Sequence, residues 1–342
     1  MKKTGVVTHP LYIKHDPGPY HPESPERLKE IYSMIDSSGL GEMLVSIEAR
    51  PATVREICLV HSEDYYNFVE SSDGSTMSLD PDTSTSPDSF RAAVLAVGGA
   101  LELVDKVVDG ELDNGFALVR PPGHHAERAQ ARGFCLFNNI AICAQHAIED
   151  LGLKRVMIVD WDLHHGNGTM HSFWDRKDIL YSSTHQYPYY PGTGALQDIG
   201  GKGAEGYTIS VPLSTGMGDD EFAAIFAKIL LPVAQKFDPE LLLVSAGFDT
   251  LSSDPLGGMR MSPTGYGVLM KQVVEMASGS ASGKVIALLE GGYDVRRQAL
   301  AVEQVLRVML GDSNPVVENK DSDSAESLIV AVQKQLSPFW EF

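Results

Sequence analysis

The sequence has few of the features that mark secreted or membrane proteins. Its 342 residues include only three cysteines, Cys58, Cys135 and Cys143, and none of them form a C-x-x-C pair. A disulfide framework is therefore not predicted, which fits a reducing compartment. No apolar run approaches the length of a membrane span, and His9 and Pro10 interrupt the short apolar stretch behind the basic N-terminus. We therefore expect a cytoplasmic protein without a signal peptide or a membrane partner.

Basic residues are also scarce. Lys and Arg number 27 against 46 Asp and Glu, which gives a formal net charge of -19. An acidic surface repels phosphate backbones, and the sequence contains no basic patch, so direct nucleic-acid binding is not expected. The charge would suit a cationic substrate, but an ordinary acidic soluble surface explains it equally well. With 43% hydrophobic residues, the chain can bury a sizeable core.

Short apolar runs alternate with helical patterns along the chain. The runs predict buried strands, and the last of them alternates in a way that suits a sheet edge: Val6–Thr8, Phe116–Val119, Val156–Val159, Leu180–Ser183, Leu241–Ser245, Val285–Leu289 and Tyr207–Val211. The helical patterns cover Pro25–Ser37, Pro87–Val108, Asn138–Glu149, Asp219–Phe237, Thr264–Ala277 and Arg297–Leu310. This alternation predicts a single α/β domain, with a mainly parallel central sheet and helices on both faces.

No internal repeat and no long linker divides the chain. We expect residues 1–312 to form one domain, and residues 313–342 to form a polar segment with a short helix that packs on it.

Polar residues follow several predicted strands at the point where each strand ends. His124 and His125 follow one strand, Asp160 and the residues after it another, Asp249 a third and Tyr293 a fourth. The carboxyl ends of parallel strands share one edge of a sheet, and ligands bind there. The sequence therefore predicts an active site at this edge.

Asp162 and His164 lie two residues apart, so in an extended chain both side chains face the same side and can chelate one ion. Asp249 would be the third ligand. Three N/O ligands with an open fourth position are typical of a catalytic zinc, although this ligand set also allows Fe(II), Co or Mn. Taken alone, an Asp-x-His pair is more often a loop motif, and Asp249 could cap a helix. The combination favours a metal site.

The paired histidines suit proton transfer at such a metal. One imidazole of His124 and His125 could accept a proton from a water that the metal acidifies, and later donate it to a leaving group. Asp160 and Asn167 are the polar candidates to orient such an imidazole. Tyr293 follows two glycines and could donate a hydrogen bond to an oxyanion.

Together these residues resemble the arginase-like deacetylase superfamily, which comprises histone deacetylases, acetylpolyamine amidohydrolases and related bacterial enzymes. The similarity covers roughly residues 5 to 310, with the motifs in family order, and its bacterial-type pattern is closest to class II histone deacetylases. The motifs are His21-Pro22-Glu23 with Glu26-Arg27, Arg120–Ala126, Gly133–Asn139, Asp160–Gly168, Pro191–Gly194, Gly247–Asp249 and Glu290–Tyr293.

The resemblance implies a zinc-dependent amidohydrolase that removes acetyl or related acyl groups from lysine side chains, with residues 1–312 as its catalytic domain. It places one zinc ion on Asp162, His164 and Asp249. It makes His125 the general base and acid, His124 its electrostatic partner and Tyr293 the group that polarises the carbonyl, with Asp160 and Asn167 behind the histidines.

The resemblance also implies potassium sites and a substrate tunnel. The first potassium site would use Asp160, Asp162, His164, Ser183 and Thr184, and the second would use Phe173, Arg176, Ile179 and Tyr207. Gly133, Phe134 and Tyr190 would line the tunnel that holds the acyl-lysine stem.

Two positions separate the branches of the superfamily. Class I histone deacetylases carry Asp at the position of Asn167, whereas an Asn here resembles the class II and polyamine branches. A neutral amide stabilises an imidazolium less than a carboxylate does. Leu256 stands where polyamine-specific members carry Glu, which favours an acyl-lysine peptide or protein as substrate. The acidic surface and the pair Asp80 and Asp82 favour an acetylpolyamine or small amide instead, although a turn explains that pair as well.

A third reading is an inert acyl-lysine-binding module. Such a protein would lack a metal ligand, a histidine or the tyrosine, and none is missing here. Arginase chemistry would need more Asp and His ligands for two manganese ions than these loops supply. The sequence leaves the physiological substrate, the acyl length and a homo-oligomeric state open.

Overall fold

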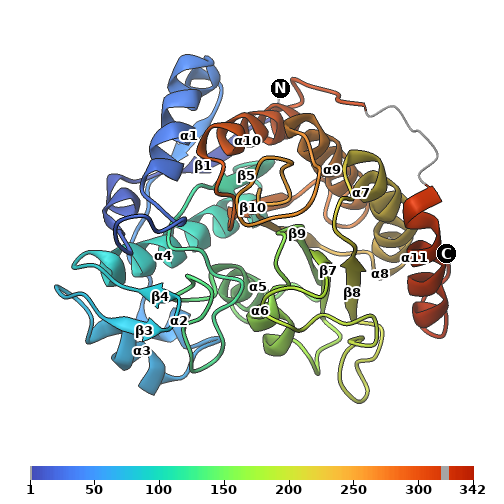
Figure 1. Cartoon of the computed structure of the whole chain (residues 1–342), viewed down its shortest axis with the longest axis horizontal. Coiled ribbons are helices and arrows are strands. Elements are labelled where there is room, and N and C mark those ends of the chain that lie inside the picture. Colours follow the sequence, from blue (N-terminus) through green and yellow to red (C-terminus); the bar gives the residue numbers. More distant parts are fainter. Residues whose placement is uncertain (1, 317–322) are drawn as a thin grey trace.

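The computed structural model describes residues 2–316 and 323–342 and confirms the predicted α/β class. Eight strands form one sheet, and each strand runs parallel to its neighbours (Figure 1). In spatial order they are β2 (Val45–Ile47), β1 (Thr4–Val7), β5 (Asn114–Ala117), β10 (Val285–Leu289), β9 (Leu241–Ala246), β6 (Val156–Asp160), β7 (Ile179–Gln186) and β8 (Thr208–Leu213).

The central strands are apolar along their whole length because both faces of the sheet are covered. Every residue of β6, β9 and β10 is buried. The two edges differ from this pattern. Strand β2 exposes Val45 and Ser46, and β8, which the alternation of residues 207–211 predicted near an edge, forms the other border.

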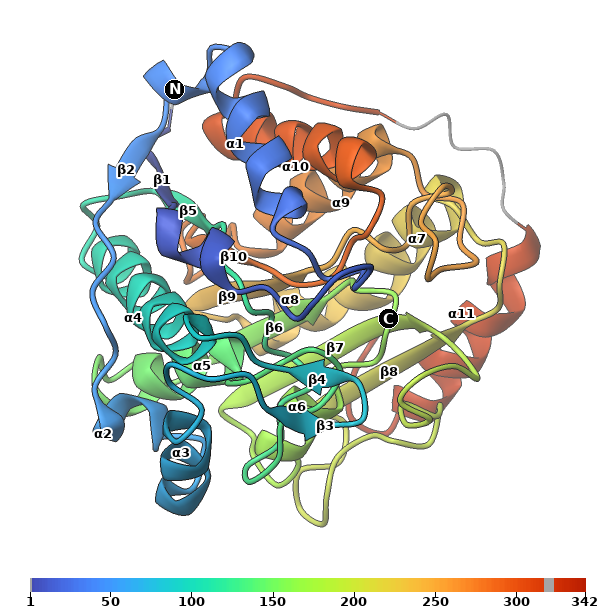
Figure 2. The ribbon, with the colours of Figure 1, turned by 60° about the vertical axis from the view of Figure 1, so that its left-hand side comes forward.

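Helices cover both faces of the sheet (Figure 2). Helices α4 (Ser89–Val108) and α5 (Asn139–Glu149) pack together on one face, where α4 contacts β1, β5 and β10 and α5 contacts β6 and β9. On the other face α10 (Val295–Leu310) contacts β1 and β5 and lies between α1 (Glu26–Ser37) and α9 (Pro263–Met276). Side chains that precede the helices cap three of them: Asn138 at α5, Ser262 at α9 and Asp294 at α10.

The predicted helix over residues 219–237 is interrupted. It consists of α7 (Asp219–Ile225), a π turn (Phe226–Leu230) and α8 (Leu231–Phe237), with Pro232 in the first turn of α8. Several short elements were not predicted at all: the 3-10 helices Pro10–Lys14 and Leu40–Glu42, α2 (Val54–Ile57), α3 (Glu63–Glu70), α6 (Asn167–Ser172), β2 and the hairpin of β3 (Ser78–Asp80) and β4 (Thr83–Ser84).

A last helix, α11 (Asp323–Leu336), packs against α7 and β8. Beyond it, the indole nitrogen of Trp340 donates to the carbonyl of Gly206 at 2.7 Å. Residues 317–322 of the predicted polar segment lie outside the described residues. Within the part of the chain that is described, no helix is both long and apolar enough to span a bilayer.

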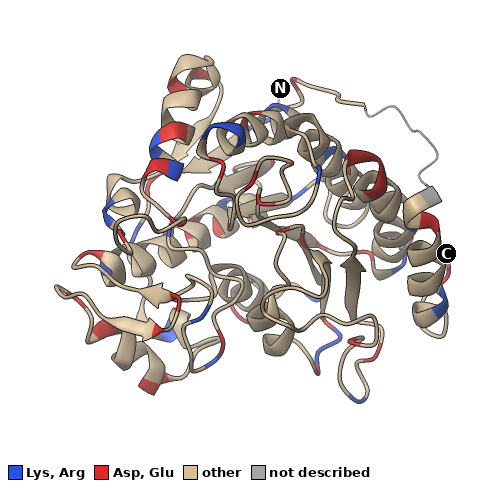
Figure 3. Cartoon of the chain, viewed as in Figure 1, with Lys and Arg blue, Asp and Glu red and all other residues tan. Residues whose placement is uncertain are grey.

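Asp and Glu are spread over helices and loops, with Lys and Arg among them (Figure 3).

Candidate active site

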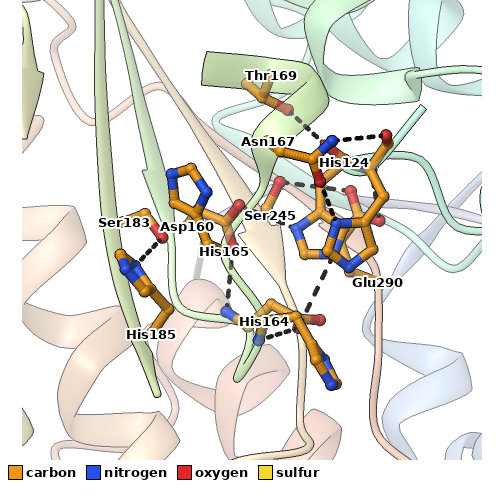
Figure 4. Close-up of polar contacts among 12 residues, drawn as sticks. His124, Asp160, His164, His165, Asn167, Thr169, Ser183, His185, Ser245 and Glu290 are labelled. Carbon is orange, nitrogen blue, oxygen red and sulfur yellow. Dashed lines mark hydrogen bonds and ion pairs between the residues drawn. The ribbon is translucent and has the colours of Figure 1, made fainter. Parts of the chain in front are cut away.

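The predicted polar residues meet at one edge of the sheet because their four strands are neighbours. Strands β5, β10, β9 and β6 lie side by side in this order. The loops after them carry His124 and His125, then Glu290 and Tyr293, then Asp249, and finally Asp162 and His164. Figure 4 shows His124, Asp160, His164 and Glu290 gathered close to one another.

Asp162, His164 and Asp249 form a compact ligand set. All three are buried, and one ligand atom from each lies within 4.8 Å of the other two. His164 Nδ1 is 3.2 Å from Asp162 Oδ1 and 3.0 Å from Asp249 Oδ2. The residues after β6 and β9 that were predicted as metal ligands therefore lie close together.

Backbone N–H groups hold both carboxylates in place. Asp162 accepts from the backbone N–H of His164 and of Gly291, each at 2.8 Å, and Asp249 accepts from Leu163 at 2.8 Å. A side chain at Gly291 would collide with the carboxylates of Asp162 and Asp249. The glycine thus allows the β10 loop to approach the ligand set closely.

The charges of this set call for a cation. Burial, together with the negative charge of Asp162, raises the pKa of Asp249 to about 7. Two buried carboxylates at this distance repel each other and lose hydration unless a positive charge lies between them. A set of two carboxylate oxygens and one imidazole nitrogen suits a divalent ion such as zinc.

His124 and His125 are adjacent but have different partners. His124 Nδ1 lies 3.0 Å from Asp160 Oδ2, whereas His125 Nδ1 lies 2.7 Å from Asn167 Oδ1. Burial lowers the pKa of His124, but the carboxylates of Asp162, Asp160 and Glu290 outweigh it and raise that pKa to about 10. Burial and the neighbouring charge of His124 hold the pKa of His125 well below its ordinary value.

Tyr293 lies beside the ligand set. Its ring meets Phe134 edge to face at 6.0 Å, and the guanidinium of Arg27 lies 5.2 Å from its centroid on the ring face. Burial and the charges of Asp249 and Asp162 raise the pKa of its phenol, so the group stays protonated and can donate. Asp254 fixes the local backbone by accepting from the N–H of Tyr293 at 2.6 Å.

Aromatic rings surround the approach to the ligand set. Tyr190 meets the ring of His125 at 5.2 Å and that of His164 at 6.0 Å, both nearly perpendicular. Phe134 packs against His21 at 4.6 Å, and Gly133 leaves no room for a side chain beside His125. The residues predicted to line a substrate tunnel thus lie beside His125 or Tyr293: Gly133, Phe134 and Tyr190.

Leu256 is connected to the ligand set through Tyr189. Its carbonyl accepts a hydrogen bond from Tyr189 Oη at 2.9 Å, and the Tyr189 ring stacks on His164 at 5.7 Å. The acidic hairpin of β3 and β4 contacts Gly133. Asp82 accepts from the backbone N–H of Gly133 at 3.0 Å, so its carboxylate is held beside this residue.

The residues predicted for potassium fall into two groups. Ser183 pairs with Asp160 in the β6–β7 register, and Thr184 Oγ1 donates to the Asp160 carbonyl at 3.4 Å, so these residues adjoin the ligand set. The remaining residues lie near the amino ends of β7 and β8, and so at the other ends of the strands from the ligand set: Phe173, Arg176, Ile179 and Tyr207.

Sequence reasoning assigned no role to Glu290. Its carboxylate accepts from the backbone N–H groups of Gly123 and His124, at 2.7 and 3.2 Å, and from Ser245 Oγ at 3.3 Å. Glu290 therefore fixes the start of the histidine loop. Its position directly after an apolar strand was the available signal.

A buried charge cluster supports the loop after β10. Glu23 pairs with Arg27 at 2.9 Å and with Arg120 through both oxygens, and all three are fully buried. Arg27 also donates to the carbonyls of Gly292 and Glu290, at 2.6 and 2.5 Å. The motifs around residues 23, 27 and 120 were noticed in the sequence, but their spacing did not reveal this role.

Comparison with known proteins matches residues 21–309 to the histone deacetylase domain family. A protein of Archaeoglobus fulgidus named "Probable deacetylase" is 38% identical over 85% of this chain and 82% of its own length. The mouse protein "Polyamine deacetylase HDAC10" is 40% identical over 93% of this chain and 49% of its own length. "Histone deacetylase 5" of Arabidopsis thaliana is 38% identical over 99% of this chain and 54% of its own length.

Among solved structures, the crystal structure of the HDA15 HD domain superposes with a TM-score of 0.93. It is 36% identical in sequence and covers 99% of this chain and 95% of that chain. The chain thus spans about half the length of two of the relatives described and nearly the whole of this solved domain.

Proposed function

The chain belongs to the histone deacetylase family, and on this premise we propose that it is a zinc-dependent amidohydrolase that removes acetyl or related acyl groups from lysine side chains. One observation supports the proposal above all: a metal-ligand set, two histidines and one tyrosine lie close together at the ends of neighbouring strands. Neither the ligand set nor the histidine pair alone would specify amide hydrolysis.

Asp162, His164 and Asp249 would hold the zinc ion. When bound, the ion would supply Lewis acidity, lowering the pKa of a water and polarising the substrate carbonyl. Both carboxylates contact the same imidazole, and burial and repulsion by Asp162 raise the pKa of Asp249 to about 7. A cation bound at this point would reduce that repulsion.

The proton-transfer steps fall to the histidines. His125 is held neutral, so its free ring nitrogen can accept a proton from the attacking water and later give it to the amine that leaves. His124, which Asp160 keeps positively charged, favours negative charge near the reacting carbonyl. Tyr293 stays protonated and can donate to the oxyanion that develops.

Leu256 favours lysine as the carrier of the acyl group. The carbonyl of this residue accepts from Tyr189, whose ring stacks on His164, so Leu256 is one residue removed from the ligand set. An apolar side chain there offers no partner to the distant ammonium of an acetylpolyamine. The second candidate is an acetylpolyamine deacylase, which the carboxylate of Asp82 beside Gly133 favours.

The remaining assignments are part of the same proposal. Residues 1–312 form the catalytic domain, residues 313–342 are an appendage, and the enzyme acts in the cytoplasm. Potassium ions would occupy the site beside the zinc ligands and the site near the amino ends of β7 and β8, where they would stabilise the loops.

One preparation tests the proposal. We expect about one zinc per chain, hydrolysis of a fluorogenic acetyl-lysine peptide, and loss of this activity with chelator. Tyr293→Phe should keep the zinc and lose ~100- to 1,000-fold in kcat. Asp249→Ala should lose the zinc.

Two results would count against the proposal. Full zinc content in Asp249→Ala would remove this residue from the metal site. Faster turnover of acetylputrescine than of the peptide would replace acyl-lysine by the polyamine substrate.

A further inference from the structure

A chain of hydrogen bonds leads from His125 to the protein surface. His125 Nδ1 lies 2.7 Å from Asn167 Oδ1, and Asn167 Nδ2 donates to Glu127 Oε1 at 2.6 Å. The Glu127 carboxylate lies 2.9 and 3.1 Å from Nδ1 of His171, whose side chain is 49% exposed. Glu127 and His171 line a surface cavity of about 210 Å³.

Asn167 by itself does not determine the tautomer of His125. Its amide presents an oxygen on one side and an NH₂ group on the other, and rotating the amide by half a turn exchanges them. With the oxygen toward His125, Nδ1 must carry the proton and Nε2 keeps its lone pair. With the NH₂ group toward His125, Nδ1 must accept and the proton moves to Nε2.

Two acceptors select the first orientation, because Asn167 Nδ2 donates weakly to the backbone carbonyl of His125 at 3.3 Å and strongly to the carboxylate of Glu127 at 2.6 Å. An ionised carboxylate only accepts hydrogen bonds, so the Asn167 group that faces it must be the NH₂. Burial raises the pKa of Glu127, but hydrogen bonds from His171 and Asn167 outweigh it and lower that pKa below its ordinary value. The residue is thus ionised at neutral pH. Its backbone N–H, which donates to Gln130 at 2.9 Å, further fixes its position.

We propose that Glu127 is a positioning residue for the general base: it orients the Asn167 amide so that His125 keeps its proton on Nδ1 and presents the lone pair of Nε2 to the reaction. This inference rests on the proposed function, because it assigns Nε2 of His125 the accepting role. Glu127 touches neither the ligand set nor His125 directly.

The chain orients and polarises, and it does not conduct protons. An amide has no proton to pass on at neutral pH, so His171 is not a proton exit for His125. The negative charge of Glu127 orients and polarises the Asn167 amide, which increases the partial negative charge on Asn167 Oδ1. Part of the stabilisation that a carboxylate at position 167 would give an imidazolium is thereby recovered.

Glu127→Gln tests the inference, because a glutamine can accept or donate, which leaves only the longer bond to the His125 carbonyl to select the amide orientation. We expect kcat on the acetyl-lysine peptide to fall about ten-fold, with KM changed less than about two-fold, because only part of the general-base contribution is lost. Glu102→Gln is the matched control. It removes a partly exposed carboxylate that pairs with Arg50, and it should leave kcat unchanged.

A second background distinguishes positioning from a structural role. In Asn167→Asp, two carboxylates face each other and repel, so the further change Glu127→Gln should raise kcat there, although it lowers kcat in the wild type. A structural role would give the same loss in both backgrounds.

The tautomer can be read without activity. In the zinc-loaded protein with ¹⁵N-labelled histidine, and with His125 assigned by comparison with His125→Ala, we expect only the Nδ1–H form. Glu127→Gln should add the Nε2–H form.

Unchanged kcat and an unchanged spectrum in Glu127→Gln would overturn the inference. A wild type that shows the Nδ1–H form but hydrolyses neither the peptide nor acetylputrescine would instead count against the proposed function, and the spectrum of Glu127→Gln would still decide the role of Glu127.

Discussion

The surroundings of His124 and of His125 differ more than their adjacency in the chain suggests. The rings lie 4.0 Å apart, yet one faces a carboxylate and the other an amide. Asp160 ends β6, whereas Asn167 begins α6, so two elements of the same βα connection supply opposite electrostatic partners. One histidine is therefore kept charged and the other neutral.

This difference shows how one loop can supply two chemical functions. A charged and a neutral imidazole side by side are stable only if their partners separate their pKa values. The carboxylates around His124 do so, and the positive charge of His124 in turn lowers the pKa of His125. The pair functions as a unit, and replacing either member should have a distinct effect.

Among the changes considered, replacing His124 or His125 by alanine should have the largest effects on activity and stability. His125→Ala should lose ~100- to 10,000-fold in kcat, because the general base is gone, while the zinc content stays the same. His124→Ala should also lose activity, and in protein prepared without potassium it leaves the buried Asp160 without a positive partner. That loss should cost roughly 3–5 kcal/mol of unfolding free energy, measured by chemical denaturation.

The two variants serve as controls for each other. His125→Ala leaves only a neutral amide without its partner, so its unfolding free energy should fall much less than that of His124→Ala. Equal destabilisation in both would contradict the assignment of a charged His124 and a neutral His125.

His146 extends the comparison to a histidine outside the site, with a smaller expected effect. Its ring nitrogens lie 2.7 Å from Asp105 on α4 and 2.9 Å from Asp150, which Arg55 also contacts. Burial lowers the pKa of His146, but the two carboxylates outweigh it and raise that pKa. Its stabilisation is thus fully present below the unfolded pKa of about 6.5 and is lost as the pH rises through the folded pKa.

We expect His146→Gln to lower the unfolding free energy by roughly 1–2 kcal/mol at pH 6, because both carboxylates are partly exposed. The difference from the wild type should shrink as the pH is raised toward 9, with activity unaffected. Denaturation curves at both pH values measure this. A difference that does not depend on pH would show that folding leaves the pKa of His146 unchanged, which contradicts this assignment.

The sequence predicted the fold well where both faces of a strand are buried. The continuous apolar runs at residues 156–159, 241–245 and 285–289 lie within β6, β9 and β10. It failed at short elements such as β2, α6 and the β3–β4 hairpin. Segments of two to six residues carry too little periodicity, and contacts from other parts of the chain determine their conformation.

The site could be predicted to the extent that its residues follow strands directly. Asp162, His164 and Asp249 are of this kind, and they meet as expected. Glu127 could not be found in this way. It stands in a polar loop and looks like a solvated charge, and its partner Asn167 is 40 residues away in the sequence. Only the folded chain brings the two side chains together.

The most direct test of the central claim is the anomalous difference map of a crystal of the zinc-loaded protein, recorded on both sides of the zinc absorption edge. The account predicts one strong zinc peak at the strand ends, within about 2.0–2.2 Å of Asp162, His164 and Asp249. Zinc bound elsewhere, with these three side chains uncoordinated, would contradict it.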